Sequence, residues 1–145
     1  MLHTKLAHKF VEEMPETLAP GTLYVSMRYA TVLHLCCCGC GCEVVTPLSP
    51  VQWRVSFDGE SITLDPSVGS WALPCRSHYV IRNGQVIQAL PWTEEEVQQG
   101  HDKQKRARST YFGTDVEEPQ KSTATSAVTT PSWVRRLINL VRRGS

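Results

Sequence analysis

Apolar and polar residues alternate along much of the segment between residues 22 and 90, as they do in strands buried on one face. The clearest case is VQWRVSF, where every second residue is apolar: Val51, Trp53, Val55 and Phe57. With turn residues separating the segments, the same pattern predicts strands at about 22–27, 30–36, 42–48, 51–57, 61–67 and 78–90. These segments predict a β-rich body.

Two dipeptides predict tight turns inside this body. Asp58-Gly59 separates the fourth and fifth apolar segments, and Asn83-Gly84 lies inside the last. Both are typical of two-residue hairpin turns, which join antiparallel strands. The fold class predicted is therefore α+β, with a small, mostly antiparallel sheet or barrel-like body and short flanking helices.

The flanking helices are predicted from a different periodicity. In TKLAHKFVEEM, residues 4–14, apolar side chains recur at helical spacing, and Pro15 ends the pattern. A second helix is expected at about 94–107, because Thr93 and Glu96 have the spacing of a capping box. This second helix is largely polar, and Gly100 weakens it.

Beyond these elements the composition changes. Residues 1–108 are expected to form the compact domain, and 109–130, rich in Ser, Thr, Glu and Pro, a disordered linker. Residues 131–145 predict a basic amphipathic helix, with Trp133, Leu137, Ile138 and Val141 on one face and four arginines around the rest. Docking on the domain, binding to a partner or an anionic surface, and fraying disorder all remain open for it.

Charge and hydropathy narrow the function classes. The formal net charge is +1, and the β-rich body has no basic stripe, so binding to nucleic acid is the weakest interpretation. No apolar run reaches the roughly 18–20 residues that span a bilayer, and the first residues lack the apolar core of a secretory signal. A cytoplasmic, reducing location is predicted, where clustered cysteines are more often metal ligands or catalytic groups than disulfides.

The segment HLCCCGCGCEVV, residues 34–45, holds five of the six cysteines. Gly39 and Gly41 give its backbone the freedom to turn several thiolates toward one metal ion. The remaining cysteine, Cys75, is the natural distant ligand to close a zinc site. Another metal, an iron–sulfur or copper(I) centre, a redox-active or nucleophilic cysteine, and unliganded packing are the alternatives. His34 is a possible ligand, a group that hydrogen-bonds to a ligand, or a strand residue.

A serine nucleophile needs a base within hydrogen-bond reach, and histidine is the usual one. Ser77 and His78 are adjacent and would point to opposite faces of a strand, so they make a poor pair. Ser67 lies eleven residues before His78 and could fold back onto it. Asp65 and Asp58 are weakly supported candidates for an orienting acid.

The order of these motifs resembles a small bacterial cysteine-rich family found in Bub-type, ubiquitination-like operons. The resemblance spans about residues 10–100. Its pattern H-x-C-x-C-G-C-G falls on His34, Cys36, Cys38, Gly39, Cys40 and Gly41. A Pro-Ser pair follows at 66–67, and C-x-S-H-Y-x-I falls on Cys75, Ser77, His78, Tyr79 and Ile81.

The resemblance implies a zinc-supported serine peptidase that processes a ubiquitin-like protein or releases it from targets. It nominates Ser67 as nucleophile and His78 as base, with backbone N–H groups near Gly69 or in the Gly39–Gly41 turn holding the oxyanion. It implies a Zn2+ ligand set of Cys36, Cys38, Cys40 and Cys75. Cys37 and Cys42 are then extra cysteines, either of which could compete as a ligand.

A second function is compatible with the same residues. A non-enzymatic zinc domain could recruit a ubiquitin-like protein or its activating and conjugating enzymes. The cysteine cluster, the missing third catalytic residue and the basic C-terminal helix favour this adaptor. Hydrolysis that depends on Ser67 and His78 separates the peptidase from the adaptor.

Overall fold

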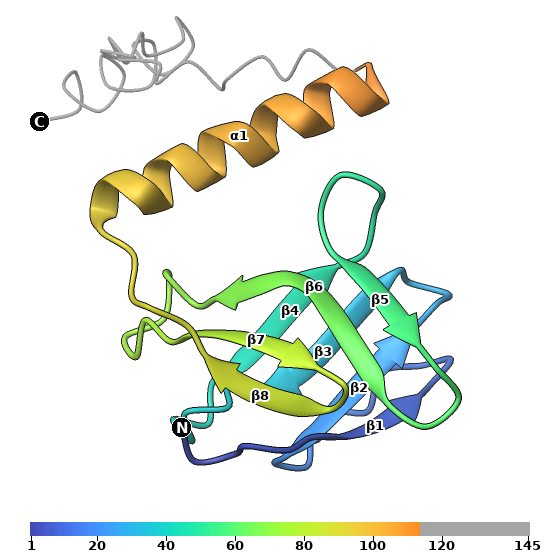
Figure 1. Ribbon diagram of the computed structural model, residues 1–145. Coiled ribbons are helices and arrows are strands. Elements are labelled where there is room, and N and C mark those ends of the chain that lie inside the picture. Colours follow the sequence, from blue (N-terminus) through green and yellow to red (C-terminus); the bar gives the residue numbers. More distant parts are fainter. Residues whose placement is uncertain (114–145) are drawn as a thin grey trace, which may run out of the picture. The chain divides into compact units, whose positions relative to one another are not determined.

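The alternating segments between residues 22 and 90 form seven short strands in the structure, a computed structural model that describes residues 1–113, and one further strand precedes them (Figure 1). The strands are β1 (Ala7–Phe10), β2 (Thr22–Ser26), β3 (Thr31–Leu35), β4 (Glu43–Pro47), β5 (Arg54–Phe57), β6 (Ile62–Gly69), β7 (His78–Arg82) and β8 (Gln85–Gln88), and one helix follows, α1 (Glu94–Phe112). The β-rich body predicted from alternation is confirmed.

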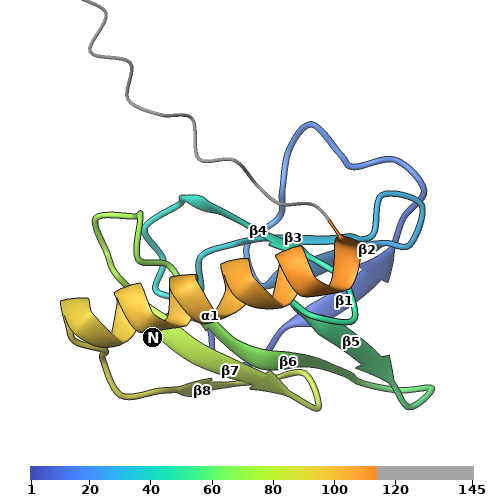
Figure 2. The same ribbon diagram turned by 90° about the horizontal axis from the view of Figure 1, so that it is seen from above.

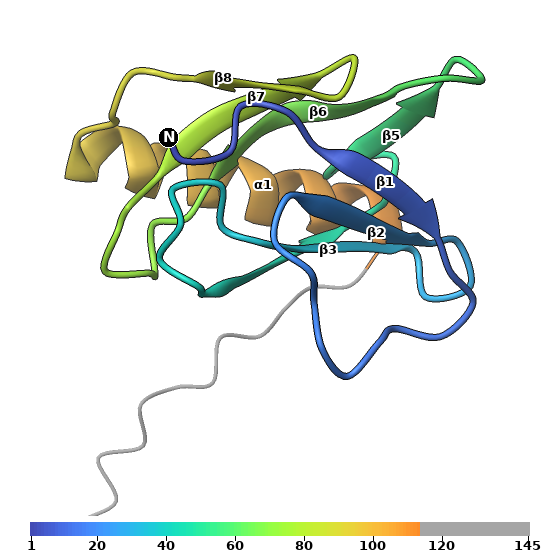
Figure 3. The same cartoon turned by 90° about the horizontal axis from the view of Figure 1, so that it is seen from below.

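The strands form two sheets with the orders β1-β2-β3-β4 and β5-β6-β7-β8. All neighbours are antiparallel except β1 and β2, which are parallel. Asn83 and Gly84 have φ angles of 50° and 70°, as the predicted two-residue turn between β7 and β8 requires. Seen from below, the sheets lie as two layers (Figure 3). They do not close into a barrel, so the barrel-like alternative is wrong.

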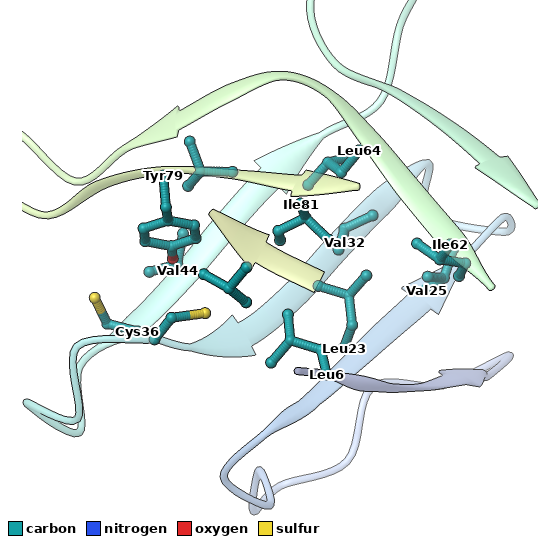
Figure 4. Packing of buried hydrophobic residues seen from close by; sticks show 13 residues of the cluster. Leu6, Leu23, Val25, Val32, Cys36, Val44, Ile62, Leu64, Tyr79 and Ile81 are labelled. Carbon is teal, nitrogen blue, oxygen red and sulfur yellow. The ribbon is translucent and has the colours of Figure 1, made fainter. Parts of the chain in front are cut away.

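The core lies between the two layers. It combines Leu23, Val25, Val32 and Val44 of the first sheet with Ile62, Leu64, Tyr79 and Ile81 of the second (Figure 4). Each of these residues is buried, and all except Val44 are exposed by 1% or less of their surface. Burial of this apolar surface drives the two sheets together.

The N-terminal helix predicted for residues 4–14 is wrong. Ala7–Phe10 is strand β1, and the preceding Lys5 pairs with Gln85 beside β8. Leu6 satisfies either periodicity and is buried in the core. The segment is too short to hold a helix by itself, since isolated helices below about 12–15 residues are marginal. Pairing with β2 and β8 satisfies its backbone groups instead.

The second predicted helix is confirmed. Thr93 accepts a hydrogen bond from the Glu96 N–H, and the Glu96 side chain accepts one from the Thr93 N–H, which makes the capping box. The helix continues to Phe112, four residues past the predicted boundary at 108, and ends at Gly113 with a left-handed φ of 63°. The rest of the predicted linker and the predicted helix at 131–145 lie outside the described residues. No helix within residues 1–113 is long and apolar enough to cross a membrane.

One buried polar pair supports this core, and its removal should be measurable. The Tyr79 hydroxyl lies 2.8 Å from Nε2 of the fully buried His34. Tyr79→Phe is expected to destabilise the protein by about 1–3 kcal/mol, because the imidazole is left without this partner. Tyr29→Phe, which removes an exposed bond to Glu13, should change stability by less than ~0.5 kcal/mol. Urea unfolding measures both, and equal losses would contradict the expectation.

Candidate functional site

The cysteine-rich loop, residues 36–42, joins β3 to β4. Gly39 and Gly41 have φ angles of 91° and 77°, a conformation that glycine adopts far more readily than other residues. The Cys36 N–H donates to the Cys42 carbonyl at 2.8 Å, which closes the loop at its base. The loop is therefore tight enough to turn several sulfur atoms toward one point.

Four sulfur atoms gather at that point. Their Sγ atoms all lie within 4.8 Å of one another: Cys36, Cys38 and Cys40 of the loop, and Cys75 between β6 and β7. The Cys36 sulfur is 3.4 Å from that of Cys38 and 3.8 Å from that of Cys75. Four thiolates bound tetrahedrally to zinc at about 2.3 Å lie about 3.8 Å apart, so the group fits a metal of this size. Four sulfur donors suit other soft metals as well.

The remaining cysteines and His34 stand outside this group. Cys37 is fully buried in the core, and burial raises the pKa of its thiol to about 11. His34 contacts Tyr79 in the core, where burial lowers its pKa to about 4. The structure therefore brings together the four cysteines nominated by the resemblance and leaves Cys37, Cys42 and His34 elsewhere.

Ser77 joins the cysteine group to strand β7. Its side chain hydrogen-bonds to the Cys38 thiol and, with help from nearby backbone and sulfur groups, lowers the pKa of that thiol to about 6. The next residue, His78, begins β7. The cysteine group and His78 are therefore held by the same short segment.

Strand pairing explains how Ser67 meets His78. Gly69 on β6 is directly opposite His78 on β7, and Ser67 lies two residues before Gly69. Side chains two residues apart share one face of a strand, and diagonal neighbours across a pair lie within reach of each other. Tyr79 points into the core, so its neighbour His78 points to the outer face of this sheet.

The Ser67 Oγ lies 2.9 Å from the His78 Nε2. The other ring nitrogen, Nδ1, lies 2.6 Å from the backbone carbonyl of Leu90. A carbonyl only accepts hydrogen bonds, so the neutral imidazole carries its proton on Nδ1 and donates it to Leu90. Nε2 is then free to accept the hydrogen bond of the Ser67 hydroxyl. This is the tautomer that a general base for serine requires.

Two tryptophans enclose the histidine. The rings of Trp71 and Trp92 each lie 5.1 Å from the His78 ring and stack on each other at 5.5 Å. A Cβ on Gly69 would come within 2.3 Å of the Trp71 ring, so only glycine leaves room for it there. His78 is consequently only 8% exposed, and hydrogen bonds at both ring nitrogens hold its ring in place.

Neither suggested acid orients the histidine. The Asp58 carboxylate accepts hydrogen bonds from the backbone of Ser61 and Glu60, which lower its pKa to about 2 and tie it to the β5–β6 turn. Asp65 lies opposite Arg54 in the β5–β6 register, and the His78 Nδ1 that an acid would orient is hydrogen-bonded to the Leu90 carbonyl instead. Sequence reasoning missed this carbonyl because a backbone atom leaves no residue-type signal. The contacts of Trp71 and Trp92 with His78 were also missed. Trp71 follows Gly69-Ser70 and Trp92 follows Pro91, and neither position indicates by itself a contact with a histidine.

A groove of about 380 Å3 lies between α1 and the outer face of β6. Ser67 and His78 line it together with Trp53, Trp71 and Trp92. Both views show α1 running along this side of the body (Figures 1 and 2). The serine and histidine are therefore placed where a ligand can reach them.

Residues 10–89, more than half of the chain, match the family described as bacterial ubiquitination-like system serine protease (BubE). The matched range includes the cysteine group, Ser67 and His78, although the match does not by itself test any of these residues. No curated protein and no solved structure matches the chain. The chain thus belongs to the BubE family, the serine proteases of bacterial ubiquitination-like systems.

Proposed function

We propose that this protein is a zinc-stabilised serine peptidase that processes a ubiquitin-like protein or releases it from conjugates. The observation that carries the proposal is the hydrogen-bonded series Ser67 Oγ, His78 Nε2, His78 Nδ1 and Leu90 carbonyl, with distances of 2.9 Å and 2.6 Å. Nucleophile, base and orienting acceptor stand in the order that serine hydrolysis needs. A backbone carbonyl takes the place that a carboxylate holds in the Ser-His-Asp triad.

In the first half of the reaction, the Ser67 Oγ attacks the carbonyl carbon of the scissile bond while His78 Nε2 takes the hydroxyl proton. The tetrahedral intermediate collapses as His78 donates that proton to the leaving amine, which gives an acyl-serine. In the second half, His78 takes a proton from water, the hydroxide attacks the acyl carbon, and the proton returns to Ser67. Product carboxylate is released and the enzyme is restored.

The oxyanion of each intermediate needs N–H donors. In the Gly39–Gly41 turn, the Gly39 N–H already donates to the Cys36 carbonyl at 3.0 Å. Gly69, two residues after Ser67 on the same face, has no side chain to block its N–H. We therefore assign the oxyanion to backbone N–H groups near Gly69.

The four cysteine thiolates, Cys36, Cys38, Cys40 and Cys75, would hold Zn2+. A set of four protein ligands leaves no open position, which is typical of structural rather than catalytic zinc. Zinc here would supply a cross-link between the β3–β4 loop and the connection that leads into His78. Two residues of this chain would hold the same connection. Ser77 hydrogen-bonds to the Cys38 thiol, and Arg76 forms an ion pair with Glu94 of α1 at 2.7 Å.

The setting proposed for this activity is the cytoplasm, with the ubiquitin-like protein and its activating and conjugating enzymes as partners. The compact domain, predicted as 1–108, is proposed to extend to the end of α1 at Phe112, and the rest of 109–130 is proposed as the linker. The C-terminal residues 131–145 are proposed to bind a partner or an anionic surface through their arginines and apolar side chains. None of the catalytic steps above depends on that segment.

The test is intact-mass spectrometry of a ubiquitin-like precursor extended beyond its tail, before and after incubation with the purified protein. The expected result is a single cut that removes a defined C-terminal piece. If the folded, metal-loaded protein binds the precursor but leaves its mass unchanged, the peptidase hypothesis is refuted and the adaptor hypothesis is favoured.

His78→Gln is expected to lower kcat/KM by about 10²–10⁴-fold, the usual contribution of a general acid–base group. Glutamine can occupy the site but cannot carry the proton from Ser67 to the leaving group. His8→Gln, on strand β1 among exposed aromatic rings, is the matched control and should leave kcat/KM unchanged. Steady-state kinetics on the precursor measures both variants. Similar rates for His78→Gln and the unaltered protein would rule out His78 as the base.

A further inference from the structure

Strand β6 continues past the end of its partner β5. The β5–β6 pairing ends at Arg54 opposite Asp65, whereas β6 continues to Gly69. On its other side, Val68 and Gly69 pair with Tyr79 and His78 of β7, after a register shift between Leu64 and Val68. Among the described residues, no strand pairs with residues 66–69 on the β5 side. This stretch, the free edge of β6, contains Ser67.

The backbone groups of Ser67 and Gly69 point away from β7. The Ser70 N–H donates to the Ser77 carbonyl of the β6–β7 side at 2.8 Å. Neighbouring residues in a strand direct their backbone groups to opposite sides, so the N–H and carbonyl of Gly69 point away from β7. The Ser67 carbonyl points the same way, because the Trp53 indole N–H, on the β5 side, donates to it at 3.2 Å.

Helix α1 forms the opposite wall and is not packed onto the sheet. Its groove side presents Gly100, Gln104 and Ala107, which are small or polar, and the only buried residue of α1 is Val97 near its start. A helix that closed directly on the sheet would present a stripe of large apolar side chains there. The 380 Å3 between helix and strand falls in the ordinary range for ligand sites, about 300–1,000 Å3.

The floor of the groove restricts the size of what can enter. The Trp71 ring packs against Gly69 so closely that a single added Cβ would clash with it. Trp92 stacks on Trp71 and continues this wall. The side chains that line the groove include Lys103 and His101 and no acid. The space beside Ser67 therefore suits a bare main chain with small side chains.

We propose that the substrate enters this groove as an extended peptide that adds a strand to the free edge of β6, with glycine or another small residue at the scissile bond. The Gly69 carbonyl and the Ser67 N–H would pair with the peptide, and α1 would cover it. Strand addition is a common mode of peptide binding because main-chain hydrogen bonds supply affinity for any extended sequence. This inference rests on the proposed function, since it assigns the substrate of the same serine.

Binding to the Ser67→Ala variant tests the inference without any chemistry. The probe is a ten-residue peptide with the C-terminal sequence of the system's ubiquitin-like protein, methylated in turn at each backbone nitrogen. Tryptophan fluorescence reports binding, since Trp53, Trp71 and Trp92 line the groove. Methylation at alternate positions near the scissile residue is expected to weaken binding about tenfold or more, and at the positions between them about twofold or less. A uniform effect, or no binding at millimolar peptide, would overturn the inference.

Gln104→Trp provides an independent test, because it fills the groove from the α1 side. Peptide affinity and precursor cleavage should each fall about tenfold or more, while hydrolysis of a small activated ester, which needs only Ser67 and His78, should persist. Gln98→Trp places the same residue on the exposed side of α1, where the Gln98 side chain donates a hydrogen bond to Asp102 of the same helix, and should change neither. Unchanged cleavage in Gln104→Trp would overturn strand addition. If the unaltered protein hydrolyses neither the ester nor the precursor, the proposed function itself is refuted.

Discussion

Ser67→Ala is expected to lower the rate of precursor cleavage by about 10⁴-fold or more, to the level of background hydrolysis. The change removes the only atom that can form the acyl-enzyme in the proposed reaction, and His78 would be left with no proton to take. Ser67 is partly exposed on a strand edge and its side chain bonds to His78 alone among the described residues. The thermal midpoint should therefore move little. Intact-mass kinetics and a thermal melt measure the two effects.

Ser70→Ala is the matched control for this change. Ser70 lies three residues further along, is buried, and its hydroxyl has no hydrogen-bond partner among the described residues. Its removal should leave cleavage within about twofold, because the hydroxyl contacts neither His78 nor the groove. Cleavage by Ser67→Ala at a tenth or more of the normal rate would show that another residue is the nucleophile.

Strands β2 to β8 were predictable because each carries its own local signal. Alternation marks the buried face, and Asp58-Gly59 and Asn83-Gly84 mark the turns, so these hairpins need no information from the rest of the chain. The start of α1 was predictable for the same reason, since Thr93 and Glu96 satisfy each other within one turn. Local chemistry and the final fold agree in these segments.

The N-terminal segment was mispredicted because its structure depends on distant residues. Leu6 and Phe10 fit both a helix and a strand, and the choice is made by β2 and by the Gly84 carbonyl, which accepts the Leu6 N–H at 2.8 Å. The arrangement of two sheets likewise depends on which strands pair across long connections. Local periodicity predicts neither the strand at residues 7–10 nor the division of the strands into two sheets.

The candidate site divides in the same way. The cysteine loop could be predicted from composition, since Gly39 and Gly41 accompany the thiols. The pairing of Ser67 with His78 could be suggested only as a fold-back, because it depends on a register in which Gly69 faces His78. The Leu90 carbonyl could not be predicted, because its role follows from the path of the chain between β8 and α1 rather than from its side chain.

Removal of the metal is the other change expected to have a large effect. Cys75→Ser should lower the thermal midpoint by on the order of 15–30 °C, equivalent to about 4 kcal/mol or more, and reduce bound zinc below one atom per chain. Cys75 is the one member of the sulfur group outside the β3–β4 loop, so its loss frees that loop from the connection carrying Trp71 and Ser77. Cleavage should fall as well, because His78 begins the strand that this connection anchors. Elemental analysis, thermal melts and the precursor assay measure the three effects.

Cys42→Ser separates the loss of a ligand from the loss of any thiol. Cys42 belongs to the same loop, and its carbonyl accepts the Cys36 N–H whichever side chain it carries, but its sulfur is outside the group of four. It should keep one zinc and a nearly unchanged thermal midpoint, and a strong chelator should bring it and the unaltered protein to the same low stability as Cys75→Ser. A chelator-insensitive midpoint would mean that the four cysteines are held by packing alone. Zinc loss in Cys42→Ser with retention in Cys40→Ser would move the fourth ligand from Cys40 to Cys42, since the two flank Gly41 in the same loop.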